Sequence, residues 1–189
     1  PRARGLEHLR RRGPFIISPN HQGYLDPFFL VSVLPFDVFR QLFFVGAAEY
    51  FQTRLTAWLA RSLNVVPVDP DANLLPAMQA GAFALRHGKV LVLFPEGERS
   101  IDGTVKKFKK GAAILSHHLQ VPIVPVAIDG VFELWPRNRP PDWRGFLPWS
   151  GHRVRLQFGA PLPPGGGSYA DGTALLRARV EEMWLSLHA

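Results

Sequence analysis

Six short runs of apolar residues recur along the chain, and proline, glycine or polar residues bound each of them. A short apolar run between such residues is typical of a strand buried in a sheet. The runs predict strands at residues 15–18, 41–45, 64–68, 90–94, 123–128 and 154–158. The last run alternates apolar and polar positions, which indicates a strand with one face in solvent.

Between these runs, apolar residues recur at spacings of three and four, the period of a helix with one buried side. The pattern predicts helices at residues 27–34, 49–63, 71–87, 109–119 and 170–187. Pro35 ends the first of them and Gly88 the third. Strands that alternate with helices favour an α/β fold, with a mostly parallel central sheet flanked by helices on both faces.

Length and composition indicate one globular domain. The chain has 189 residues, of which 47% are hydrophobic and 20% are charged, which excludes a disordered chain. We expect a single domain over residues 1–189 that is a fragment of a longer protein, because the sequence begins with Pro1 and not with methionine. No uncharged apolar run reaches the ~18 residues of a spanning helix. Any membrane contact is therefore expected to be peripheral.

The charge of the chain narrows the choice of partners. The formal net charge is +7, which favours phospholipid surfaces, acidic carrier proteins or phosphate-bearing substrates. We expect no nucleic-acid partner, because the basic residues are scattered and form no recognised motif. The N-terminal arginines indicate either a lipid or partner contact or a solvated helix end. The lack of cysteine excludes a thiol nucleophile and fits a reducing compartment.

His21 and Asp26 lie in the turn after the first predicted strand, in the heptapeptide Asn-His-Gln-Gly-Tyr-Leu-Asp. Pro27 follows, so Asp26 is predicted to cap the next helix. A carboxylate near a histidine fixes its tautomer and stabilises its cation, as a general base requires. The pair predicts an acid–base centre; the alternative is a capping aspartate beside a loop histidine.

Residues 94–100, Phe-Pro-Glu-Gly-Glu-Arg-Ser, follow the fourth predicted strand. Glu96 is expected to bind a substrate hydroxyl or the histidine, and the alternative is an ion pair with Arg99. Gly97 exposes the backbone there, and Arg99 with Lys109 and Lys110 suits a phosphate group. The alternative for these cations is a solvated basic loop. Because both loops follow strands, they can meet at one sheet edge.

Aromatic residues suggest two further surfaces. The candidates for an apolar groove that holds an acyl chain are Phe28, Phe29 and Phe44, and the alternative for each is a core position. The tryptophans in and beside the proline-rich region 137–149 either lie at a bilayer headgroup level or pack under a long loop; they are Trp135, Trp143 and Trp149. The histidines lack metal-ligand spacing, so no metal site is expected.

Three segments resemble motifs of the glycerolipid acyltransferases, the family of lysophosphatidate and other lysophospholipid acyltransferases. Residues 20–26 resemble its Asn-His-x4-Asp motif, residues 94–100 its Phe-Pro-Glu-Gly-Thr-Arg-Ser motif, and residues 121–127 its proline-containing fourth motif. They occur in the family's order. The chain departs from the pattern at Glu98, where threonine is usual. It departs again at Pro70, where an arginine often follows Pro-Val-Asp.

The resemblance implies an O-acyltransferase of phospholipid synthesis or remodelling at the cytoplasmic face of the membrane. It would move an acyl group from acyl-CoA or acyl-carrier protein to a lysophospholipid or glycerol-phosphate hydroxyl, without a cofactor. His21 and Asp26 would be catalytic, with oxyanion donors near Gly97 or in the fourth motif. The implied substrate-binding residues are Glu96, Gly97, Arg99, Ser100, Lys109 and Lys110. The rival class is a non-catalytic basic module that binds anionic membranes or an acidic carrier protein.

Overall fold

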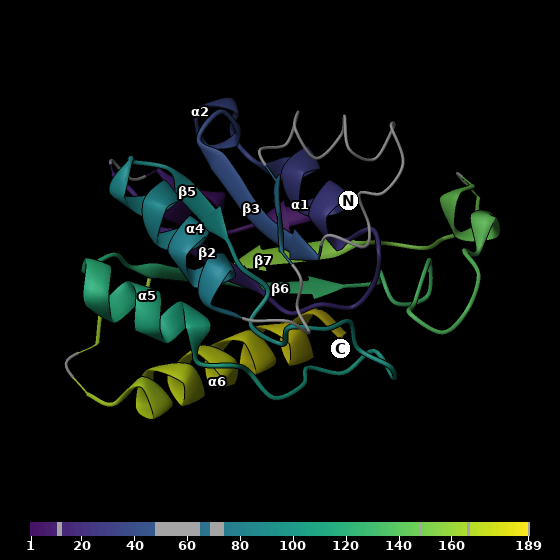
Figure 1. The fold of residues 1–189 in the computed structure, drawn as a ribbon. Coiled ribbons are helices and arrows are strands. Elements are labelled where there is room, and N and C mark those ends of the chain that lie inside the picture. Colours follow the sequence, from purple (N-terminus) through teal and green to yellow (C-terminus); the bar gives the residue numbers. More distant parts are fainter. Residues whose placement is uncertain (11–12, 48–64, 69–73, 148, 166, 189) are drawn as a thin grey trace.

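A seven-stranded sheet forms the centre of the molecule (Figure 1). The computed structural model describes residues 1–10, 13–47, 65–68, 74–147, 149–165 and 167–188. Within these residues the strand order is β1-β7-β6-β2-β5-β3-β4. Neighbouring strands are parallel, except that β7 runs antiparallel to β6. The prediction of a mostly parallel α/β sheet is confirmed.

All six predicted strands are present, with bounds that shift by a few residues. The strands are β1 (Arg2–Arg4), β2 (Ile16–Pro19), β3 (Leu42–Ala47), β4 (Val65–Val68), β5 (Val90–Val92), β6 (Ile123–Asp129) and β7 (Arg155–Phe158). The hydrophobic pattern does not predict β1, because its sequence is Arg-Ala-Arg. It pairs in parallel with β7 at the sheet edge. The first arginines therefore lie on an edge strand and not on the end of a helix.

The predicted helices are present wherever the structure describes them. The helices are η1 (Leu6–Leu9), α1 (Asp26–Val33), α2 (Phe36–Phe39), α4 (Leu74–Arg86), α5 (Gly111–Leu119), η3 (Trp143–Phe146) and α6 (Tyr169–His188). The predicted helix at 49–63 and Pro70, the second departure from the family pattern, lie outside the described residues. The helix α2 has only four residues, too few to show a helical period. Of the helices described, none has the length and apolar character needed to cross a bilayer.

Two hydrophobic cores lie on opposite faces of the sheet. Ile17 of β2 belongs to the core that includes Leu30 of α1, whereas Ile16 belongs to the core that includes Leu115 of α5. On that second face α5 contacts both α4 and α6, and the three helices form one layer (Figure 1). Helices on both faces are thus confirmed. The central strands β2 and β5 are neighbours, so the loops that follow them start from the same sheet edge.

Candidate active site

The loops after β2 and β5 are joined at the backbone of His21. The N–H of His21 donates to Oε1 of Glu96 at 3.0 Å. The N–H of Ser100 donates to the carbonyl of His21 at 2.8 Å. The expected meeting of the two loops at one sheet edge is therefore confirmed, and residues 96–100 hold the histidine from two sides.

The imidazole of His21 is oriented by Asp26. Its Nδ1 lies 2.7 Å from Oδ2 of Asp26, which is fully buried, while 17% of the His21 side chain is exposed. With the proton on Nδ1, Nε2 is left as the acceptor. Among the described residues, none hydrogen-bonds to Nε2. The ring also packs on Phe94, with ring centroids 4.2 Å apart. The geometry suits a histidine base: one nitrogen is held, and the other has no hydrogen-bond partner in the described part of the chain.

Asp26 holds the loop that precedes its helix. Its Oδ2 also accepts the N–H groups of Gln22 and Gly23, at 2.6 and 2.9 Å. The helix cap is Leu25, without a side-chain hydrogen bond, and Asp26 is the first residue of α1. The prediction that Asp26 caps the helix is wrong, because its carboxylate points back to the loop amides. Three donors converge on one oxygen and fix the orientation of the carboxylate.

Two buried amide side chains complete the loop, and neither is among the site residues predicted from the sequence. Asn20 exchanges two hydrogen bonds with the backbone of Ile128, of 2.9 and 2.7 Å. Gln22 donates to the carbonyl of Gly103 at 3.0 Å and accepts from the N–H of Val131 at 3.1 Å. An amide both donates and accepts, so it can replace a backbone partner. The available signal was the pair of amides that flank His21 after a buried strand.

The carboxylate of Glu96 is buried, and only one of its two oxygens is hydrogen-bonded within the described residues. Its Oε1 accepts from the N–H of His21, and no residue that the structure describes hydrogen-bonds to its Oε2. No ion pair joins it to Arg99 among the described residues. Burial raises the pKa of Glu96 to about 7. Binding of a substrate hydroxyl by Glu96 stays a prediction, and Oε2 is the oxygen available for it.

The raised pKa of Glu96 predicts a pH-dependent stability. Between pH 4.5 and about 7 the folded protein keeps a proton that the unfolded chain has lost. Stability should therefore fall as the pH rises through this window, by at most about 3 kcal/mol. Glu96→Gln keeps an acceptor for His21 but cannot ionise. The unfolding free energy of the wild type minus that of this variant should decrease across the window. A difference independent of pH would contradict the assignment.

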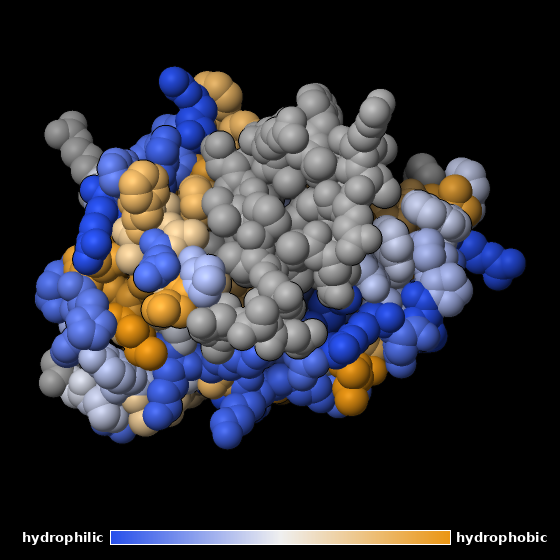
Figure 2. All heavy atoms as spheres, viewed as in Figure 1, coloured by the Kyte–Doolittle hydropathy of each residue, from blue (hydrophilic) through white to orange (hydrophobic). Residues whose placement is uncertain are grey.

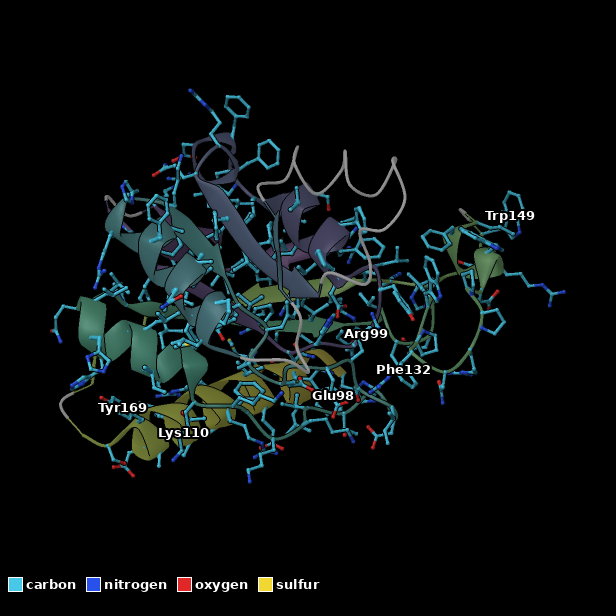
Figure 3. All side chains as sticks on the ribbon, viewed as in Figure 1. Glu98, Arg99, Lys110, Phe132, Trp149 and Tyr169 are labelled. Atoms are coloured by element: carbon cyan, nitrogen blue, oxygen red, sulfur yellow. The ribbon has the colours of Figure 1, made fainter. Side chains whose placement is uncertain are left out.

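Arg99 and Glu98 connect the 94–100 loop to the segment that begins at residue 131. The guanidinium of Arg99 lies 3.7 Å from the ring centroid of Tyr24, whose ring packs on Trp135 at 4.8 Å. Glu98 forms an ion pair with Arg137, with 2.6 Å between Oε2 and Nη1. Glu98, which stands where the family motif usually has threonine, is thus neutralised by an arginine 39 residues later in the sequence. Figure 3 shows Glu98 and Arg99 near Phe132, where this segment leaves the body.

Of the three cations predicted to bind phosphate, Lys110 lies apart from Arg99. The Nζ of Lys109 lies against Gly97, only 2.6 Å from where a Cβ on Gly97 would be. Figure 3 shows Lys110 well separated from Arg99, so these two do not form one phosphate site. Ser100 is buried, and its Oγ lies 2.9 Å from the carbonyl of Thr104. Substrate contact by Ser100 stays a prediction; in the structure its hydroxyl holds the loop.

Part of the backbone expected to donate to an oxyanion already holds the fold together. The N–H of Gly97 donates to the carbonyl of Phe94 at 3.2 Å. Residues 123–127 of the fourth motif lie in β6, which pairs with β2 on one side and β7 on the other. Donation to an oxyanion by other N–H groups near Gly97 or in the fourth motif stays a prediction.

Only part of the predicted acyl groove faces solvent. Phe28 on α1 is 49% exposed, whereas Phe44 is buried in the core. Phe29 is partly buried against the same core. Phe44 is therefore a core residue, the alternative named for it above. Contact of Phe28 and Phe29 with an acyl chain stays a prediction. Within the described ranges, no three His, Asp or Glu side chains lie close enough together to hold a metal ion.

Replacing Gly23 with alanine should destabilise the protein. A Cβ at Gly23 would lie 2.6 Å from the carbonyl oxygen of Trp135 and 3.3 Å from Val131. Relieving this contact moves backbone against backbone, which costs roughly 1–3 kcal/mol. Gly172→Ala is the matched control, since its Cβ would make an ordinary 3.5 Å contact with Ala113. Within α6 it should be neutral or stabilising. Equal unfolding free energies of the two variants would contradict this packing.

Comparison with known proteins links this geometry to a family of enzymes. A family model described as Acyltransferase matches residues 1–129. The 1-acyl-sn-glycerol-3-phosphate acyltransferase alpha of Ovis aries is 33% identical over 179 residues, 91% of this chain and 57% of the relative. The chloroplastic 1-acyl-sn-glycerol-3-phosphate acyltransferase BAT2 of Brassica napus is 29% identical over 136 residues, 70% of this chain and 38% of the relative. The chain thus spans well under two thirds of either relative.

A solved structure shares the fold over the whole chain. It is the 1-acyl-sn-glycerophosphate (LPA) acyltransferase PlsC from Thermotoga maritima, which superposes with a TM-score of 0.81 at 25% sequence identity. The match covers 100% of this chain and 72% of that protein.

Proposed function

Because the chain belongs to the acyltransferase family, we propose that it transfers a fatty acyl group from a thioester to a hydroxyl of a lysophospholipid or glycerol-phosphate acceptor. The observation that carries this proposal is the His21–Asp26 pair. Asp26 holds Nδ1 at 2.7 Å, and Nε2 has no hydrogen-bond partner within the described part of the chain. The names of the relatives make 1-acyl-glycerol-3-phosphate the first acceptor to test.

The proposed reaction is a direct transfer. Nε2 of His21 takes the proton of the acceptor hydroxyl as its oxygen attacks the thioester carbonyl. The tetrahedral intermediate then collapses, the C–S bond breaks, and the imidazolium returns the proton to the leaving thiolate. Asp26 stabilises the imidazolium, as the aspartate of a serine-type triad does. The acceptor takes the place of the serine, so no enzyme nucleophile and no cofactor are needed.

The residues around His21 suggest how an acceptor is held. Oε2 of Glu96 is buried and has no hydrogen-bond partner among residues 1–188 as far as the structure describes them, so it is suited to a second hydroxyl of the acceptor. Lys109, whose Nζ lies against Gly97, and Arg99, whose guanidinium lies over Tyr24, provide positive charge, the sign that a phosphate requires. Their positions in the structure support a phosphate-bearing acceptor and leave Lys110 out of the site.

The donor and the location are part of the same proposal. Acyl-CoA and acyl-carrier protein are both thioesters with anionic carriers, and the net charge of +7 suits either. The same charge supports peripheral contact with an anionic membrane, which we assign to the cytoplasmic face. Nucleic acid is not a proposed partner.

An acceptor panel tests the proposed function. The protein is mixed with acyl-CoA or acyl-carrier protein and with glycerol-3-phosphate, 1-acyl-glycerol-3-phosphate or lysophosphatidylethanolamine. Product masses are then measured. We expect an added acyl group on at least one phosphate-bearing acceptor. Salt-sensitive vesicle binding without product from any donor would instead favour a non-catalytic basic module.

A further inference from the structure

Four large apolar side chains are exposed within seven positions of one loop. In the aromatic loop, defined as residues 142–147 and 149, Trp149 is 80% exposed and Trp143 67%. Phe146 and Leu147 are 45% and 39% exposed. The loop extends beyond the sheet, with Trp149 near its far end (Figures 1 and 3). Hydrophobic atoms are visible there beside hydrophilic ones (Figure 2). Such a cluster is unusual on a soluble surface and indicates an interaction site.

Hydrogen bonds give the aromatic loop a defined shape. Asp142 caps η3 by accepting the N–H of Arg144 at 3.0 Å, and its own N–H donates to the carbonyl of Leu134 at 2.8 Å. At the other end, the N–H of Ser150 donates to the carbonyl of Leu147 at 3.0 Å. The rings of Trp143 and Phe146 pack together, with centroids 5.8 Å apart. The exposed side chains are therefore presented by a folded turn.

The charges around the loop select a lipid surface as its partner. Residues 136–153 contain four arginines but only one aspartate and no glutamate. Arg139 and Arg144 are exposed and form no salt bridge within the described residues. Tryptophan beside basic residues is the composition of segments that lie at the interface of an anionic membrane. Both the apolar and the charged parts of the loop match that interface.

The base of the loop is joined to the active site. The carbonyl of Trp135 accepts the N–H of Tyr24 at 3.2 Å, three residues beyond His21 in sequence. The two rings also pack together, and Arg137 pairs with Glu98. The aromatic loop is therefore fixed with respect to both loops that form the site.

We infer that the aromatic loop inserts into the headgroup region of an anionic bilayer and brings the His21 site to the lipid surface. This inference rests on the proposed function for the identity of the lipid acceptor, but the binding itself does not depend on turnover. Trp143 and Trp149 enter the interface, and Arg139 and Arg144 bind lipid phosphates. The acceptor then reaches the site without leaving the membrane completely.

The test compares a double variant, Trp143→Ser with Trp149→Ser, to the wild type. Binding is measured by co-sedimentation with vesicles of phosphatidylcholine and phosphatidylglycerol. We expect the double variant to bind at least tenfold more weakly, since two large side chains no longer leave water. The matched control is Leu175→Ser with Leu185→Ser, two apolar residues on α6 that are 49% and 57% exposed. The control should bind as the wild type does.

Activity separates this inference from the proposed function. The double variant should lose acyl transfer to a vesicle-embedded acceptor but keep the wild-type rate on a short-chain acceptor that is dispersed as monomers. If the wild type acts on neither acceptor, the proposed function fails. The vesicle-binding assay still tests whether the aromatic loop inserts into the bilayer. Equal vesicle binding by the double variant and the wild type, or no binding by the wild type, would overturn the inference.

Discussion

The variant His21→Ala should transfer acyl groups about 10²–10⁴-fold more slowly than the wild type, the usual contribution of a general base. The reason is structural. No described residue hydrogen-bonds to Nε2, while Nδ1 is held by Asp26. Alanine removes the base but leaves the two backbone hydrogen bonds of residue 21 to Glu96 and Ser100. The loop should keep its position, so the loss should fall on the rate and not on stability.

The rate is measured as esterified product formed at saturating donor and acceptor, beside an unfolding curve. The matched control is His188→Ala. His188 also contacts a buried carboxylate, Asp129, at 3.1 Å. Its loss should leave the rate unchanged. If His21→Ala keeps the wild-type rate, His21 is not the base.

The variant Asp26→Asn should also lose about 10²–10⁴-fold in rate, and in addition about 1–3 kcal/mol of stability. An amide lacks the charge that stabilises the imidazolium. Its neutral oxygen is a weaker acceptor for the donors from His21, Gln22 and Gly23. Its NH2 group would be buried at the position of Oδ1, which has no hydrogen-bond partner among the described residues. The loop is then anchored less strongly, and the imidazolium of His21 loses its counter-charge.

Asp129→Asn provides the control for this second change. Asp129 is a buried aspartate that contacts His188 and Arg155, so its loss should cost stability and leave the rate unchanged. Rates and unfolding free energies of both variants are compared with the wild type. An Asp26→Asn variant with the wild-type rate would show that the pair is structural.

The sequence predicted the elements that have a clear pattern. Ile16 and Ile17 lie in an apolar run between polar residues, which identifies β2 without knowledge of its neighbours. The strand β1 has no such run, since only Ala3 lies between its two arginines. It forms because β7 offers an edge, and that pairing joins residues more than 150 positions apart. No local pattern contains this information.

The same contrast holds for the candidate site. The meeting of His21 and Glu96 could be predicted, because each follows a buried strand and the strands are parallel. The direction of the Asp26 carboxylate could not, since a helix cap and a loop anchor use the same residue type. The partner of Glu98 is Arg137, an ion pair that depends on how the segment after β6 folds back. Such contacts depend on tertiary structure and leave no periodic signal.

Acceptor-dependent thiol release by the wild-type protein is the most direct test of the central claim, that the acyl group passes straight from thioester to hydroxyl. The protein is mixed with donor alone and with donor plus acceptor, and thiol and ester are both counted. We predict one thiol per ester with the acceptor, and no release above background without it. A burst of thiol equal to the amount of protein, with no acceptor present, would reveal an acyl-enzyme. That result would contradict the role given to His21.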